Sequence, residues 1–112
     1  MSIVEIMILT IKQDDRDKFH QLYLTLSAPL QKKWSINVVA HGPSIHDKNI
    51  YYVVRSFDSL EQRGKLLDDF YASDDWQKGP RTSILSLIKN ISTSVISEEV
   101  FKEISSKVVS EE

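Results

Sequence analysis

The sequence SIVEIMILTI, at residues 2–11, decides the fold because it is apolar on both faces. Eight of its ten residues are Ile, Val, Met, Leu or Thr, and Glu5 is its one charge, a composition typical of a β-strand. Side chains alternate between the two faces of a strand. One face therefore carries Val4, Ile6 and Ile8, and the other carries Ile3, Met7, Leu9 and Ile11. Such a strand needs cover on both sides.

A second strand of the same kind follows at residues 50–57, IYYVVRSF, in which Arg55 is the one charge. Between the two strands, apolar residues recur at helical spacing over residues 14–33, at Phe19, Leu22, Leu26 and Leu30. Pro29 predicts a bend in this helix near Ala28. Residues 34–41 are expected to form a strand and residues 42–49 a loop.

The second half of the chain repeats the order of helix and strand. Asp58 or Ser59 is expected to cap a helix, with Glu61 or Gln62 completing a capping box. A turn at residues 73–76 and a short helix at residues 81–89 lead to a Ser/Thr-rich edge strand at residues 91–96. Residues 97–112 are expected to form an amphipathic helix with an apolar stripe of Val100, Phe101, Ile104 and Val108.

The order βαββαβ predicts an α+β, ferredoxin-like fold with a four-stranded antiparallel sheet and an extra C-terminal helix. Right-handed crossovers place the two strands that are apolar on both faces in the centre of the sheet and the other two at its edges. We expect residues 1–97 to form this single domain and residues 98–112 to form the terminal helix or tail.

The apolar sheet faces also predict an assembly. Two helices cover one face of a four-stranded sheet, which leaves the other face as an exposed patch larger than soluble monomers usually tolerate. A second copy of the chain, related by a two-fold axis, is the simplest cover, so we expect a homodimer that packs sheet against sheet into a dimeric α/β barrel. The rival cover is the C-terminal helix folded onto its own sheet.

Composition excludes several classes of function. The chain has 112 residues, a formal net charge of -2 and no Cys. Disulfides, thiolate nucleophiles and Cys-based zinc sites are therefore excluded, and no nucleic-acid partner is expected from such a charge. With no run of 18 apolar residues and no basic signal-peptide start, we expect no membrane partner and a cytoplasmic location.

Several segments carry a resemblance to a known family. They are VRSFDSLEQR at residues 54–63, YASDDWQ at residues 71–77 and GPR at residues 79–81. Together with an apolar first strand and a helix with a late Pro29, they resemble the NIPSNAP-like members of the dimeric α/β-barrel superfamily over about residues 3–96. The resemblance implies a ferredoxin-like homodimer but no defined reaction.

Related branches of that superfamily include cofactor-free quinol or polyketide monooxygenases, haem-degrading monooxygenases, muconolactone isomerases and stress-induced proteins. Haem degradation needs a ligating His beside the pocket and an Asn that shapes the ring. Here His20 is on the first helix, where we expect a surface residue, and the first strand has no Asn. We therefore expect no haem and no other cofactor.

His41, Tyr52 and Arg55 are the candidate catalytic residues. His41 ends a strand at the expected pocket mouth, where an imidazole can move protons near neutral pH. An Arg55 side chain facing the pocket would hold an enolate, phenolate or carboxylate, and His41 or Tyr52 would manage the proton. In the alternative interpretation Arg55 only pairs with a helix carboxylate such as Glu61.

Three aromatic residues, Trp76, Trp34 and Tyr51, are the candidate substrate-binding residues, because aromatic rings line sites for apolar ligands. In the alternative interpretation they only pack the fold. Arg63 and Arg81 are expected to bind backbone carbonyls or Asp74 and Asp75. No His spacing indicates a metal ligand set.

Two functional hypotheses follow from these residues. The first is a homodimeric small-molecule-binding protein that acts as a cofactor-independent monooxygenase or isomerase on a hydrophobic or aromatic substrate. The second is a non-catalytic dimeric binding or stress-associated module of the NIPSNAP type, whose terminal helix recruits another protein.

Overall fold

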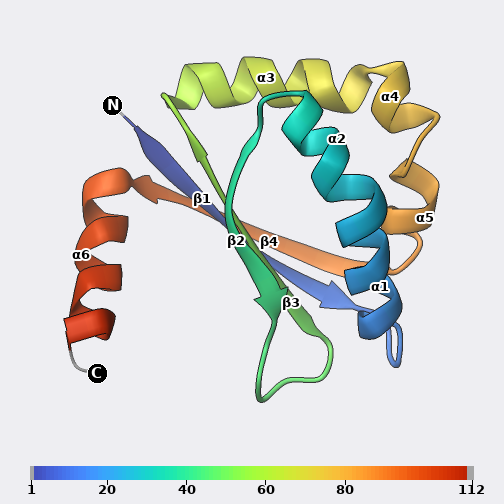
Figure 1. Cartoon of the computed structure of the whole chain (residues 1–112), viewed down its shortest axis with the longest axis horizontal. Helices are drawn as coiled ribbons and strands as arrows, with labels where there is room; N and C mark the ends of the chain where they lie inside the picture. Colours follow the sequence, from blue (N-terminus) through green and yellow to red (C-terminus); the bar gives the residue numbers. More distant parts are fainter. Residues whose placement is uncertain (1, 111–112) are drawn as a thin grey trace.

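The computed structural model describes residues 2–110, with side chains as far as Lys107. Figure 1 shows a four-stranded sheet with a group of helices beside it and one helix set apart. The elements are, in chain order, β1 (Ile3–Ile11), α1 (Arg16–Leu22), the π-helical turn η1 (Tyr23–Ser27), α2 (Ala28–Lys33), β2 (Asn37–Pro43), β3 (Ile50–Phe57), α3 (Leu60–Ala72), α4 (Asp74–Gln77), α5 (Arg81–Leu85), β4 (Ile88–Ser97) and α6 (Glu98–Ser110).

The sheet is antiparallel throughout and has the strand order β2-β3-β1-β4. The predicted ferredoxin-like topology is therefore confirmed, with β1 and β3 in the centre. In the register between these strands Ile3 lies opposite Phe57, and Glu5 lies directly opposite Arg55. The two lone charges of the central strands are thus neighbours on the same face.

The bounds of two strands differ from the prediction. Strand β2 ends at Pro43, two residues into the predicted loop, because Gly42 and Pro43 still pair with Tyr52 and Tyr51 of β3. Strand β2 begins at Asn37, because Trp34 still closes α2 and Ser35 turns the chain with a φ of 59°. Strand β4 begins at Ile88 and takes over the end of the predicted short helix. The reason is pairing, since Lys12 donates to the Leu87 carbonyl and the strand then follows β1.

The first helix is wider than an α-helix just before Pro29. At η1 the Ala28 N–H donates to the Tyr23 carbonyl, five residues earlier. The predicted apolar stripe is wrong in this turn, because Leu26 is 43% exposed. The buried face of the helix instead carries residues four apart, namely Phe19, Tyr23, Ser27 and Gln31.

The core lies between the helices and one face of the sheet. Tyr51 and Val53 of β3 are buried there against Phe19 of α1 and Phe70 of α3. Ser59 caps α3 as predicted, because its hydroxyl accepts from the Gln62 N–H while the Gln62 side chain accepts from the Asp58 N–H. This cap fixes where α3 begins and therefore which of its side chains reach the core.

The other sheet face has no helical layer over its centre. It carries the alternate residues of the central strands, among them Ile6, Ile8 and Tyr52, and Ile8 is 38% exposed. Helix α6 extends from the end of β4, away from the other helices (Figure 1), and leaves Ile104 55% exposed. Helix α6 contacts β1 and β4, and Val4 on this face is 2% exposed, so the rival arrangement, in which this helix covers its own sheet, is not observed over the centre of the face around Ile8. The predicted stripe residue Val108 lies outside the described side chains.

Within residues 2–110, no helix combines the length and the apolar character needed to cross a membrane.

Candidate functional site

A cavity of about 440 Å³ lies between the sheet and the helices. Most of its wall is apolar, and the residues of that wall include Leu9, Phe19, Val53, Leu67, Phe70, Trp76 and Ile84. One part of the wall is polar and contains Glu5, Tyr23, Gln31, Arg55, Arg63 and Tyr71. A few convergent polar groups in an apolar cavity are typical of sites for small organic molecules.

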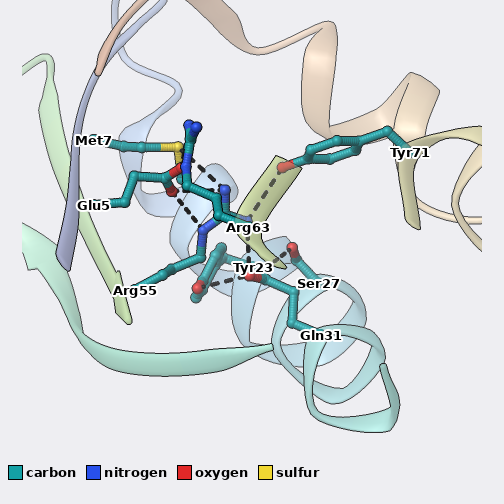
Figure 2. Close-up of polar contacts among 8 residues, drawn as sticks. All are labelled: Glu5, Met7, Tyr23, Ser27, Gln31, Arg55, Arg63 and Tyr71. Carbon is teal, nitrogen blue, oxygen red and sulfur yellow. Dashed lines mark hydrogen bonds and ion pairs between the residues drawn. The ribbon is translucent and has the colours of Figure 1, made fainter. Parts of the chain in front are cut away.

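The centre of the polar wall is Glu5, whose side chain is 1% exposed. Its Oε1 accepts from Arg55 Nε at 2.7 Å and lies 2.7 Å from Arg55 Nη2. Its Oε2 accepts from Arg63 Nε at 2.7 Å and lies 2.7 Å from Arg63 Nη2. Figure 2 shows the carboxylate between the two guanidinium groups. One buried acid therefore binds two arginines, one from β3 and one from α3.

Arg55 makes further contacts. Its Nη1 donates to Gln31 Oε1 at 3.3 Å and to the Tyr71 hydroxyl at 3.2 Å, and its Nη2 lies 3.9 Å from Met7 Sδ. Burial alone would lower the pKa of Arg55, but Tyr71 and Glu5 raise it, so the guanidinium stays charged.

Gln31 connects this cluster to the first helix. Its Nε2 donates to the Tyr23 hydroxyl at 3.3 Å and to Ser27 Oγ at 3.1 Å (Figure 2). Burial raises the pKa of Tyr23, which remains a phenol at neutral pH. Because Tyr23 and Ser27 are four residues apart and share the buried face of the helix, both reach the cavity with Gln31.

The cavity carries an excess of positive charge. Three arginines line it, at positions 55, 63 and 81, and Glu5 is the one carboxylate among its lining residues. Both oxygens of this carboxylate already accept from arginine N–H groups. The remaining positive charge makes the site suited to bind an anion.

A second polar cluster lies outside this cavity, around Tyr51. The Tyr51 hydroxyl is 2.7 Å from His20 Nδ1 and 3.0 Å from His41 Nδ1. Burial, with Tyr23 nearby, raises the pKa of Tyr51 to about 12. Burial and the neighbouring His20 lower the pKa of His41. His20, expected on the surface, is half-buried in this cluster.

The six candidate residues from the sequence lie in different places. Arg55 and Trp76 line the cavity, whereas Tyr52 is on the opposite face of the sheet. His41 and Tyr51 belong to the second cluster. Trp34 donates from Nε1 to Asp75 Oδ2 at 3.0 Å, and this bond, with Lys33, lowers the pKa of Asp75.

Sequence reasoning missed Glu5, Gln31, Tyr23 and Tyr71. The expected partner of Arg55, Glu61, is wrong, and Arg63 binds Glu5 rather than the expected Asp74 or Asp75. The signal for Glu5 was present, because it is the lone charge of an apolar strand and shares its face with Met7. The register between β1 and β3 was needed to pair it with Arg55.

No group of three or more His, Cys, Asp or Glu side chains placed to hold a metal ion occurs in the described part of the chain.

Replacing the buried acid tests its role in the fold. Glu5→Gln leaves two guanidinium groups without their counter-charge, so we expect it to lower the free energy of unfolding by about 3–5 kcal/mol. Glu61→Gln, on the exposed start of α3, is the matched control and should cost less than about 1 kcal/mol. Urea unfolding measures both. Equal losses for the two variants would contradict a structural role for Glu5.

The lowered pKa of His41 predicts a dependence of stability on pH. Between the pKa of the folded state and the ordinary value of 6.5, the unfolded chain binds more protons than the folded chain. The contribution of His41 is therefore complete above about pH 6.5 and is lost as the pH falls through the folded-state pKa. Thermal unfolding across this range should show a shallower acid loss for His41→Gln than for the wild type. Identical slopes would refute this linkage.

The sequence matches no protein-family profile, and no curated protein is similar to it. Solved structures do match. An uncharacterised NIPSNAP-like domain protein from Burkholderia xenovorans superposes with a TM-score of 0.78 at 18% identity, over 85% of this chain and 83% of that one. A NIPSNAP family protein of unknown function from Agrobacterium tumefaciens gives a TM-score of 0.78 at 18% identity, over 85% and 86% of the two chains.

A more distant match is a candidate antibiotic biosynthesis monooxygenase from Bordetella bronchiseptica, with a TM-score of 0.68 at 16% identity over 87% of this chain and 96% of that one. Identities this low establish the fold alone. The resemblance predicted from the residues is confirmed at that level, and the chain has the ferredoxin-like fold of the NIPSNAP family structures.

Proposed function

We propose that the chain is a homodimeric, cytoplasmic small-molecule-binding protein whose cavity holds a hydrophobic or aromatic compound with an anionic oxygen. The observation that carries this proposal is the cavity itself, an apolar space of about 440 Å³ with the Glu5, Arg55 and Arg63 cluster in its wall. The apolar wall favours a ligand body that leaves water, and the excess of arginines favours a negative charge on it.

The open sheet face supports the homodimer. Ile6, Ile8 and Tyr52 lie on this face, and the terminal helix leaves Ile8 exposed. The same face of a second copy is complementary to it, because both copies present apolar side chains from central strands. The charged side chains of β1 and β3, Glu5 and Arg55, are on the helix side of the sheet and do not oppose this contact.

The catalytic form of the proposal is a cofactor-independent oxygenase or isomerase. In such an oxygenation a substrate CH₂ group and O₂ give a ketone and water, with all four electrons supplied by the substrate. Arg55 and its cluster would stabilise the substrate anion, and His41 or Tyr52 would have to act from outside the cavity. The monooxygenase description of one structural relative favours testing this reaction.

The alternative to catalysis is a non-catalytic or stress-associated module that binds its ligand without converting it. The saturated Glu5 carboxylate favours it, since the cavity then offers no carboxylate base.

A ligand screen tests the proposed function. Aromatic acids, quinols and polyphenols should raise the melting temperature by several degrees at concentrations well above their dissociation constants. Glucose, which is polar and uncharged, should not. An oxygen electrode run on the compounds that bind separates turnover from binding. If no compound of the panel shifts the melting temperature, the proposed function is wrong.

The dimer has its own test. Ile8→Asp places a charge in the centre of the open face, so we expect the wild type to sediment as a dimer at micromolar concentration and the variant as a monomer. Leu60→Asp is the matched control, because Leu60 is 63% exposed at the start of α3, and it should remain dimeric. A monomeric wild type would rule out this assembly.

A further inference from the structure

We infer that the anionic group of the ligand is a carboxylate and that Arg63 binds it, while Arg55 is a positioning residue that contacts no ligand atom. The inference rests on the proposed function and names the ligand class of the same cavity. It reverses the role expected for Arg55, and it follows from counting the donors of the two arginines.

Arg55 has no donor left for a ligand. A guanidinium group has five N–H bonds in a fixed plane. Nε and one hydrogen of Nη2 are directed to Glu5, and the second hydrogen of Nη2 faces Met7 Sδ. The two hydrogens of Nη1 go to Gln31 and to Tyr71. With a side chain only 3% exposed, Arg55 is saturated by protein groups on every edge.

Arg63 is different, because Glu5 occupies only one of its two edges. Nε and Nη2 bind Glu5 Oε2, and within the described part of the chain no residue binds Nη1. The side chain is 26% exposed and lines the cavity. The edge formed by Nη1 and the remaining hydrogen of Nη2 is therefore free to bind a ligand.

The free edge selects a carboxylate. Its two parallel N–H bonds match the two oxygens of a carboxylate, whereas a phenolate or an enolate presents one oxygen. Charge favours a monoanion. Glu5 neutralises one of its two guanidinium partners, so one positive charge in the cluster remains to be balanced by the ligand.

Helix α3 also supplies side chains that can contact the apolar body of the ligand. Arg63, Leu67, Phe70 and Tyr71 recur at three- and four-residue steps and all line the cavity. A carboxylate on Arg63 therefore places an apolar body along Leu67 and Phe70. The Tyr71 hydroxyl accepts from Arg55 at 3.2 Å, so its own hydrogen is available to donate to the ligand.

The test compares two probes that share a body and differ in charge, 2-naphthoate and 2-naphthylmethanol, by calorimetry near neutral pH. The wild type should bind the acid at least about tenfold more tightly than the alcohol. Arg63→Lys keeps a positive charge for Glu5 but lacks the fork, so it should remove most of this preference and leave the affinity for the alcohol unchanged. Lys65→Gln, on the exposed side of the same helix, is the control and should retain the preference.

Arg55→Lys separates the two arginines. Its preference for the acid should persist even where its melting temperature falls, because Arg55 does not touch the ligand. Loss of the preference in Arg55→Lys but not in Arg63→Lys would overturn the inference, and so would equal binding of the two probes by the wild type. If neither probe binds the wild type, the inference fails, and the ligand panel decides separately on the proposed function.

Discussion

The structure depends on one buried carboxylate. Glu5 lies under the helices at 1% exposure, where an unpaired charge would cost several kcal/mol. Arg55 neutralises it from the neighbouring strand and Arg63 binds it from α3, so this side chain joins two central strands and the helix above them. The bonds also specify register. A slip of β1 by one residue would turn Glu5 to the open face of the sheet and leave Arg55 buried without its counter-charge.

Around this carboxylate, one part of the cavity wall has its hydrogen-bond donors and acceptors paired with protein groups. Another part has donors left for a ligand. Gln31 accepts from Arg55 and donates to Tyr23 and Ser27, which leaves that side of the cluster internally satisfied. Both hydroxyl groups lie on the same side of the helix, because residues four apart in a helix share a face. Arg63, on α3, keeps one edge of its guanidinium group without a hydrogen-bond partner among the described residues. A ligand can therefore bind to Arg63, whereas Arg55 has no donor left.

The sequence predicted the fold better than the site, for a physical reason. Two strands that are apolar on both faces, in a chain with the element order βαββαβ, sufficed to predict the strand order and to predict that one sheet face has no helical layer. The cavity depends on how the helices dock on the sheet, and these contacts cannot be read from a single sequence. Parity placed Tyr51 and Tyr52 on opposite faces, but only the helices determine which face is buried. Glu5 was visible as a lone charge, whereas its contact with Arg63 depends on the docking of α3, and the contact of Arg55 with Gln31 depends on the docking of the first helix.

The division of the sheet into a ligand side and an open side has a consequence for how an assembled protein would respond to its ligand. Met7 lines the cavity and its neighbour Ile8 faces the other way. When two copies pack through their open faces, the two cavities lie on the outer sides of a double sheet, and each is lined by residues of one chain. In that proposed assembly each site would be complete within one chain, so a ligand in one protomer would impose no steric demand on the other, and we would expect independent rather than cooperative binding.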